Sequence, residues 1–245
     1  MNEVVKYHNS LNKVEFKGFN SVEMNLFFTI CSQVKEKGSN EIIFNFDQLK
    51  SLSNYSPTAN QRFVQDLQRT NEKLQKLSIV FDDGNIIRSL VLFPTFEINR
   101  KALTLKVKVN NEFEFILNAI DSNFTRFELQ EFVEIKAIYS KNLYRLLKQW
   151  RSVGKRVFTI ESFRNLLAIP ESYRMTDIDR QILKPAIKEL SRYFDNLEVK
   201  KVKRGQGRGG RVVQLIFTFT PQNKESEHKR KLPSVSLYNW LDQDQ

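Results

Sequence analysis

The hydrophobic positions in the first half of the chain change their spacing in a regular order. Three- and four-residue spacing predicts helices, and alternation predicts strands. The pattern therefore predicts a helix over 21–37, a strand over 42–46, a short helix over 47–53 and a longer helix over 58–76. Beyond them, Asp83 and Gly84 are a strong hairpin signal between the apolar runs 77–81 and 86–93, and 103–109 alternates as a third strand. We interpret these three strands as a β-sheet wing.

The second half of the chain repeats this order. Its spacing predicts a helix over 128–151, a strand over 157–160, a short helix over 161–167 and, after a polar turn at 170–177, a helix that ends near Phe194. Pro185 lies within that last helix and predicts a bend, because proline cannot donate a hydrogen bond to the carbonyl of Gln181. A hairpin follows, in which apolar residues alternate with lysines up to Lys203 and the return strand begins at Arg211.

The two halves match at a constant offset of 114 residues. The matched positions are Ile43, Phe44, Phe46, Asp47, Leu49 and Leu52 in the first half and Val157, Phe158, Ile160, Glu161, Phe163 and Leu166 in the second. In each copy a strand leads into a helix with an acidic residue in its first turn, where the helix dipole favours negative charge. The sequence therefore predicts an α+β fold: two tandem winged-helix domains with a pseudo-two-fold internal repeat, plus a flexible C-terminal tail.

We expect the N-terminal winged-helix domain to span 1–115 and the C-terminal one 128–220, each near the usual size for a single core. Periodicity weakens between them, and Asp121, Ser122 and Asn123 supply turn chemistry, so 116–127 is interpreted as a linker. Residues 221–245 form the tail.

The charge of the chain favours a polyanionic partner. Lysine and arginine total 39 against 28 acidic residues, which gives a net charge of +11 and a pI of about 9.6. Nucleic acid and an anionic membrane would both satisfy this charge. Because the start of the chain lacks a secretion signal and no apolar run approaches the roughly 18 residues of a spanning helix, we expect a cytoplasmic protein and no membrane partner. The single cysteine, Cys31, lies on an apolar helical stripe and is expected to be buried.

The predicted longer helix of each half has a polar outer face. In the first half this face carries Gln61, Arg62, Gln65, Arg69 and Lys73, and in the second Arg180, Gln181, Lys184, Lys188 and Arg192. The hairpin of the second half adds a glycine-rich cationic tip, and its candidate phosphate contacts are Lys200, Lys201, Lys203, Arg204, Arg208 and Arg211. Glycine permits close approach to a phosphate backbone, and arginine can fork onto phosphate oxygens. A hairpin whose charges merely face water is the plainer interpretation, but the adjoining helix is cationic as well.

Catalytic constellations do not occur in the sequence. The two histidines, His8 and His228, lie near opposite ends, and no G-x-x-x-x-G-K-[ST] loop is present. Gly205, Gly207 and Gly210 satisfy G-x-G-x-x-G, but that fingerprint requires a following helix, and here an alternating strand follows. We therefore expect a protein that is not an enzyme, with no cofactor and no metal site.

Two stretches carry a resemblance to a known family: YSKNLYRLLKQWR at 139–151 and FTIESFRNLLAIPESYRMTDIDRQILKPAIKELSRYFDNLEVKKVK at 158–203. They resemble the iteron-binding plasmid replication initiators, the Rep_3 or RepB-like family, and the likeness extends over about residues 3–220. The resemblance implies a bacterial protein that binds direct repeats, the iterons, in double-stranded origin DNA. It also implies origin opening, recruitment of host replication proteins such as the replicative helicase or its loader, and repression of its own promoter by dimers, with monomers as the initiating form.

In that family the second domain is the stronger sequence reader. The resemblance places this role on Arg174, Thr176, Asp177, Arg180, Gln181 and Lys184. The residue types agree, because arginine and lysine suit guanine, glutamine suits adenine and an acidic group suits the amino group of cytosine. Lys184, Lys188 and the wing can neutralise phosphates.

Two alternatives and one further motif stay open. A winged-helix transcriptional repressor without initiator activity would use the same surface, and a non-enzymatic scaffold for membrane or RNA is a more distant alternative. In the tail, the terminal motif places Leu237, Tyr238, Trp240 and Leu241 close together. These residues either dock into a partner's groove or fold back onto the protein's own surface.

Overall fold

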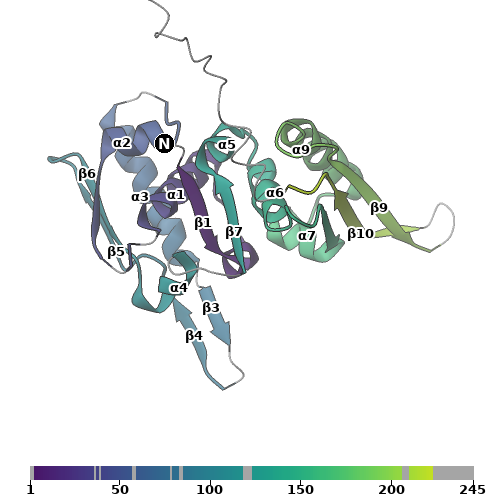
Figure 1. Ribbon diagram of the computed structural model, residues 1–245, viewed down its shortest axis with the longest axis horizontal. Helices are drawn as coiled ribbons and strands as arrows, with labels where there is room; N and C mark the ends of the chain where they lie inside the picture. The colour runs from purple at the N-terminus through teal and green to yellow at the C-terminus, as the bar shows by residue number, and fades with distance from the viewer. Residues whose placement is uncertain are drawn as a thin grey trace, which may run out of the picture.

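The computed structural model describes residues 3–35, 37–38, 40–56, 59–77, 79–82, 85–117, 123–205 and 210–222. They form two lobes that lie side by side, with the first half of the chain in one lobe and β8 to β10 in the other (Figure 1). The tail motif at 237–241 lies outside the described residues.

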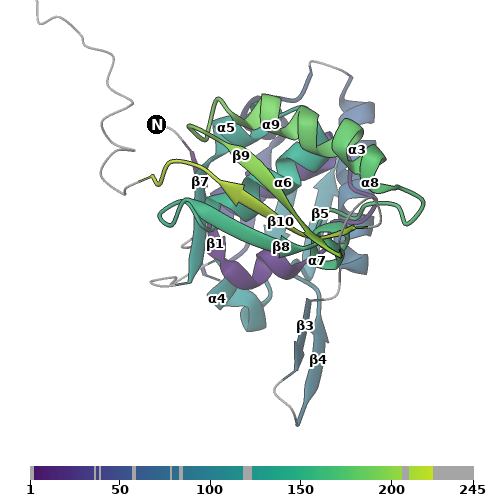
Figure 2. The same cartoon turned by 90° about the vertical axis from the view of Figure 1, so that its right-hand side faces the viewer.

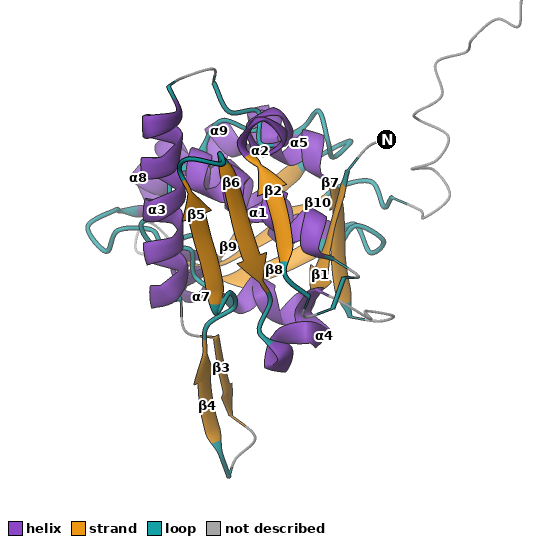
Figure 3. Cartoon of the chain, turned by 90° about the vertical axis from the view of Figure 1, so that its left-hand side faces the viewer, coloured by secondary structure: helices purple, strands orange, loops and turns teal. Residues whose placement is uncertain are grey.

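The N-terminal lobe is a winged helix with additions. Its winged-helix elements are α1 (Ser21–Val34), β2 (Ile42–Asn45), α2 (Phe46–Leu52), α3 (Asn60–Lys76), β5 (Thr95–Asn99) and β6 (Thr104–Lys108). Helix α1 begins with a capping box, in which Asn20 and Glu23 each accept the other's backbone N–H. The three strands form an antiparallel sheet in the order β2-β6-β5, and Figure 3 shows its open face.

The C-terminal lobe repeats this arrangement. Its elements are α6 (Ile138–Lys148), β8 (Lys155–Thr159), α7 (Ile160–Leu166), α8 (Met175–Ile178), the π-helical segment η3 (Asp179–Leu183), α9 (Lys184–Leu190), β9 (Glu198–Arg204) and β10 (Arg211–Thr218). The sheet order β8-β10-β9 is antiparallel and corresponds strand by strand to that of the first lobe.

The internal repeat is confirmed residue by residue. Helices α2 and α7 each have seven residues and begin and end 114 positions apart. Their N-caps, Asn45 and Thr159, both accept a hydrogen bond from the backbone N–H three residues on, at 2.7 and 3.1 Å. Both helices are followed by a residue of positive φ at the matching place, Asn54 at 50° and Ala168 at 52°. The strand-to-helix unit is therefore the same local structure built twice.

The three strands predicted to form the wing of the first half do not belong to one sheet. Strands β3 (Ile79–Asp82) and β4 (Ile87–Leu90) pair only with each other, in a separate hairpin that projects from the lobe (Figure 1). The wing proper is the β5–β6 hairpin, and β5 was not expected. Asp83 and Gly84, the predicted turn of the projecting hairpin, lie outside the described residues. Local pattern identifies strands but does not say which of them pair.

The continuous helix expected over 128–151 is also wrong. Residues Phe124–Glu128 form strand β7, which pairs with β1 (Val4–His8), a partner near the start of the chain that local spacing does not reveal. Two helices follow, α5 (Leu129–Glu134) and α6, and the chain is extended at Ile135 and Ala137 between them. There the Ser21 hydroxyl donates to the carbonyl of Lys136, and Glu189 accepts from its N–H at 2.6 Å. Tertiary contacts therefore satisfy the backbone groups at the break.

Strand β7 occupies the last part of the segment expected to be a linker, so 124–127 belong to a sheet. The extents expected for the two domains otherwise stay a prediction. The remaining elements of the first lobe are the 3-10 helices η1 (Asn9–Lys13) and η2 (Asn111–Phe113) and the short helix α4 (Glu114–Leu117).

The core is rich in aromatic rings and contains cations. Phe28, Phe127 and Phe132 pack against one another, with ring centroids 4.8 to 5.7 Å apart. Cys31 is buried as expected. Arg145 is fully buried and donates to the carbonyl of Val14 at 3.0 Å and to the carbonyl of Leu11 at 3.3 Å. Hydrogen bonds of this kind are what make a buried guanidinium tolerable.

Candidate DNA interface

The second lobe presents the helix that the sequence predicts as its DNA reader. Arg174, Thr176, Arg180, Gln181, Lys184 and Lys188 are all exposed along α8, η3 and α9. The buried side of the same stretch carries Ile178, Ile182, Ala186 and Leu190, as the four-residue spacing predicts. The helix begins at Met175 rather than after Asp177, because Asp177 accepts from the backbone N–H of Arg174 at 3.0 Å and so caps it.

The helix is interrupted where Pro185 predicts a bend. The five residues before α9 wind as a π-helix, and Pro185, the second residue of α9, follows directly, so the change of helix type lies where proline cannot donate to Gln181. A π-helical turn widens the backbone, and such turns are frequent at functional sites. The exposed residues Arg180 and Gln181 both lie within it.

Asp177 has a structural role in addition to the base contact predicted for it. Besides capping the helix, its carboxylate faces the guanidinium of Arg180 at 3.4 Å. The Arg180 side chain nevertheless stays 76% exposed. Asp177 therefore pairs with an Arg180 that stays open to solvent, and the contact of Asp177 with cytosine stays a prediction.

Two residues that the sequence did not single out as DNA contacts hold the reading helix in place. Arg164 of α7 donates to the carbonyl of Tyr173 at 2.6 Å, which fixes the turn before α8. The Tyr173 hydroxyl donates to the side-chain oxygen of Gln181 at 2.8 Å. The amide nitrogen of Gln181 is thereby left as the end that can donate to a base. No local spacing signals these pairs, because their partners lie eight and nine residues apart across a turn.

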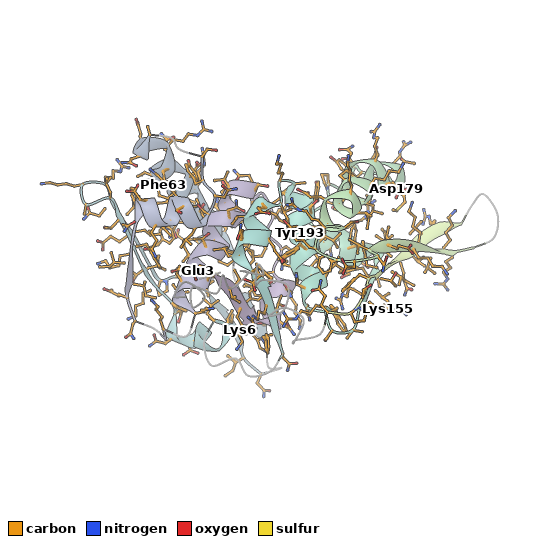
Figure 4. The ribbon with its side chains drawn as sticks, turned by 45° about the horizontal axis from the view of Figure 1, so that its top comes forward. Glu3, Lys6, Phe63, Lys155, Asp179 and Tyr193 are labelled. Carbon is orange, nitrogen blue, oxygen red and sulfur yellow. The ribbon has the colours of Figure 1, made fainter. Side chains whose placement is uncertain are left out.

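The cationic wing forms as predicted. Strands β9 and β10 pair from Glu198–Thr218 to Arg204–Arg211, and Lys200, Lys201, Lys203, Arg204 and Arg211 are exposed. Arg208 lies outside the described residues. Lys201 forms an ion pair with Asp179 of η3, which ties the wing to the reading helix. Figure 4 shows Asp179 on that helix, beside the hairpin.

A groove of about 590 Å³ lies between the reading helix and the wing. Thr176 and Asp179 line its helix side, and Lys203 and Arg211 its wing side. Four cations, Arg164, Lys201, Lys203 and Arg211, and one acidic side chain, Asp179, therefore line a groove that suits a strand of polyanion.

The first lobe presents its longer helix differently. Gln61, Arg62, Gln65 and Arg69 are exposed on α3. Arg69 forms an ion pair with Asp66, and this hydrogen-bonded carboxylate raises the pKa of Arg69. Asp66 also accepts from Tyr55 at 2.5 Å. Arg69 is thus partly neutralised before any DNA is bound.

Lys73, the last residue predicted on the outer face of α3, is engaged by its own lobe. Its ammonium donates to both carboxylate oxygens of Glu23, at 2.7 and 2.6 Å, and to the carbonyl of Gly18 at 2.7 Å. Glu23 is fully buried in the first turn of α1. An ammonium has three N–H donors, so these contacts occupy all of them. Lys73 therefore joins α3 to α1, and its role as a DNA contact stays a prediction. Helical spacing places it near the outer face but does not reveal the buried acid beside it.

The two longer helices share one side of the molecule. Views from opposite ends, Figures 2 and 3, both place α3 and α8 at the same edge. A single duplex lying along that side could therefore contact both lobes.

We also searched the described residues for a metal site and for a membrane-spanning helix. Within the described ranges, no group of three histidine, cysteine or acidic side chains is placed to hold a metal ion. None of the helices described is long and apolar enough to cross a membrane.

Two winged helices, each with a strand-to-helix unit and a β hairpin, define a double winged-helix protein. The comparisons with known proteins make this more specific. Residues 4–148 match the family model for the initiator replication protein WH1 domain, and 159–219 match the initiator Rep protein WH2 domain. The chain belongs to the Rep_3 family of plasmid replication initiators.

Two similar proteins illustrate the likeness. The chain is 34% identical to the probable replication protein rep of Bifidobacterium longum (strain NCC 2705) over 222 residues, which cover 89% of this chain and 73% of that protein. Its fold is similar to that of the Pi initiator protein in a crystal structure with iteron DNA. That match has a TM-score of 0.70 at 13% identity and covers 91% of this chain and 98% of the other.

Proposed function

We propose that this protein initiates plasmid replication by binding iterons in double-stranded origin DNA with both winged helices. The second lobe acts as the main sequence reader. The observation that carries the proposal is the exposed set on α8, η3 and α9, beside a cationic wing and on the same side as α3. The Pi initiator protein, which has the same fold, was crystallised with iteron DNA, and this supports the choice of ligand.

Within this proposal, Arg174, Arg180 and Gln181 read bases while Lys184, Lys188 and the wing neutralise phosphates. Two lobes on one chain can read successive major-groove faces about one helical turn apart without a dimer. A direct repeat, which lacks two-fold symmetry, suits such a monomer.

The test is a fluorescence-anisotropy titration with a duplex of direct repeats from the DNA beside the gene, against a shuffled duplex, across a salt series. We expect a preference of about a thousandfold or more at physiological salt, which is the range of specific recognition. Equal and steeply salt-dependent binding to both duplexes would contradict the proposal.

Origin opening, recruitment of the replicative helicase or its loader, and autorepression by dimers in equilibrium with monomers complete the proposed function in the bacterial cytoplasm. A plasmid whose origin is supplied with the protein in trans separates an initiator from a simple repressor, because only the initiator sustains replication. A repressor would bind the repeats and leave the origin silent.

The tail motif Leu237, Tyr238, Trp240 and Leu241 is our candidate for recruiting a host replication protein. Deleting 236–245 should leave iteron binding intact and abolish recruitment in a pull-down with the helicase. Loss of DNA affinity in the deletion variant would argue that the motif folds back onto the protein instead.

A further inference from the structure

A second cationic cleft lies at the junction of the two lobes, apart from the reading helix and the wing. It has a volume of about 500 Å³ and is bounded by η1, α6 and the β8–α7 corner of the second lobe. Its lining contains His8, Lys13 and Arg156, and none of the described residues that line it carries a carboxylate. Figure 2 shows the N-terminal elements beside α7 and β8 at this junction. The cleft therefore favours an anion.

Arg156, which is half-buried, differs from the buried cations Lys148 and Arg145. Lys148 faces Glu131 at 3.1 Å, and Arg145 has carbonyl and amide acceptors. By contrast, the Nε of Arg156 is buried with no hydrogen-bond partner among the described residues. Burial lowers the pKa of Arg156, and no carboxylate of the described residues opposes that effect. A partly desolvated guanidinium whose Nε–H has no acceptor is costly to the fold unless something supplies one.

Two aromatic rings hold this guanidinium in place. It lies 4.9 Å from the ring centroids of both Trp150 and Phe158. Rings at this distance limit the positions that an arginine can adopt and also attract its charge. The side chain is thus positioned before any ligand binds, which lowers the entropy cost of binding.

The neutral groups around the cleft are also arranged as donors. The side-chain oxygen of Gln149 accepts from Asn12 at 3.0 Å, which leaves its amide nitrogen to donate. The side-chain oxygen of Asn9 accepts from Thr125 at 2.8 Å, with the same consequence. A tetrahedral oxyanion needs several donors from different directions, and this cleft supplies them.

We propose that the cleft binds a phosphate group, with Arg156 as its central ligand and Lys13 and Gln149 as further donors. The phosphate belongs either to the backbone of bound DNA or to a free phosphate compound. Because the cleft is lined by both lobes, the occupant fixes one lobe against the other. The DNA source rests on the proposed function, whereas the free-phosphate source does not.

The test uses the full chain with Trp240→Phe, so that Trp150, stacked on Arg156, is the sole indole. Its fluorescence and the Tm are recorded in sodium phosphate and in sodium chloride at equal pH and ionic strength. Arg156→Met retains much of the packing and removes the charge, and Arg156→Lys retains the charge alone. The matched control is Lys155→Met, which removes a cation from the exposed face of the same strand (Figure 4).

If free phosphate is the ligand, phosphate changes the Trp150 signal and raises the Tm in the parent and in Lys155→Met, but not in Arg156→Met. If DNA supplies the phosphate, inorganic phosphate has no effect. Instead, a random-sequence duplex produces an Arg156-dependent Trp150 signal, and Arg156→Met lowers the salt slope by about one. Arg156→Lys should recover part of either response.

The proposal is overturned if neither phosphate nor duplex gives a response that depends on Arg156, or if Lys155→Met removes the response equally. A cooperative thermal transition of Arg156→Met in chloride shows that this variant is folded, whatever its Tm. A random duplex suffices for this test, so a protein without iteron preference would contradict the proposed function and leave the phosphate site standing.

Discussion

The two winged helices share their local construction and differ in what they do with charge. In the first lobe Lys73 is bound to Glu23 and Arg69 to Asp66, and on the wing Lys106 pairs with Glu97. In the second lobe the cations of α9 and most of those of the wing are exposed. The comparison teaches that the first copy pairs cations of its longer helix with acidic side chains of its own lobe, while the second leaves Lys184 and Lys188 of α9 exposed.

The helix that precedes each strand-to-helix unit differs as well. Helices α1 and α6 end 114 residues apart, so Phe27 and Lys141 occupy corresponding positions, as do Cys31 and Arg145. All four side chains are buried. At these positions α1 therefore packs through apolar side chains. Helix α6, which lies between the lobes, instead carries the buried cations Lys141 and Arg145, and both donate to main-chain carbonyls.

The largest expected effect is a loss of stability when the ion pair between Lys73 and Glu23 in the first lobe is broken. Lys73→Met leaves the fully buried Glu23 without its cation, which should lower the free energy of unfolding by about 3–5 kcal/mol in a urea titration. Lys184→Met, an exposed lysine on the reading helix, is the control and should change stability by less than about 0.5 kcal/mol. Equal stability of both variants would remove the distinction between the lobes.

The buried lysine of α6, Lys141, should make the stability of the protein depend on pH. Burial lowers the pKa of Lys141 to about 7, against roughly 10.4 for lysine in an unfolded chain. Between these values the unfolded state binds the extra proton, so stability rises with pH by at most about 1.4 kcal/mol per unit. Below pH 7 both states are protonated and the full cost of burial applies.

Lys141→Met should therefore stabilise the protein at neutral pH and below and flatten the pH dependence between 7 and 10, measured by urea unfolding at each pH. Lys188→Met, on the exposed face of α9, should leave the dependence as it is. An unchanged slope in Lys141→Met would show that this lysine is not the group responsible.

Base reading is expected to be unequal between the lobes. Arg180→Ala should cost roughly 1–3 kcal/mol in binding to the repeats and relax sequence preference. Arg69→Ala should cost less, because its guanidinium is already bound to Asp66. Anisotropy with repeat and shuffled duplexes measures both. A loss in Arg180→Ala that is equal for the two duplexes would identify a phosphate contact instead of a base reader.

The wing of the second lobe should also contribute more to DNA binding than that of the first, with a smaller difference than for the longer helices. Lys203→Ala should weaken binding to all sequences similarly and reduce the salt slope by about one. Lys106→Ala on β6 should change neither, because its ammonium lies 2.8 Å from Glu97. A salt slope that falls equally in both variants would indicate that the first wing also contacts phosphate.

The smallest effect uses the repeat itself. Ala168 has a φ of 52°, a conformation costly for alanine, while Asn54 at the matching position has a φ of 50°, which asparagine tolerates better. Ala168→Gly should therefore raise the free energy of unfolding by about 0.5–1 kcal/mol, and Asn54→Gly should change it less. Thermal unfolding of the two variants compares their stabilities. A lower stability of Ala168→Gly would contradict the prediction.

The sequence by itself determined the local units of this protein. The offset of 114 residues, the capped helices α2 and α7, the buried stripe from Ile178 to Leu190 and the cationic hairpin all follow from spacing, capping and turn chemistry within a few residues. Pro185 marked the irregular part of the reading helix for the same reason, since a missing N–H acts on its own turn.

Only the tertiary structure decided which strands pair and which charges are free. Strand β7 needs β1 from the other end of the first lobe, and the break before α6 is held by Ser21 and Glu189. Lys73 pairs with Glu23, and the Nε of Arg156 has no acceptor among the described residues, beside a cleft made by both lobes. Such facts depend on contacts between residues far apart in the chain, which local periodicity does not encode.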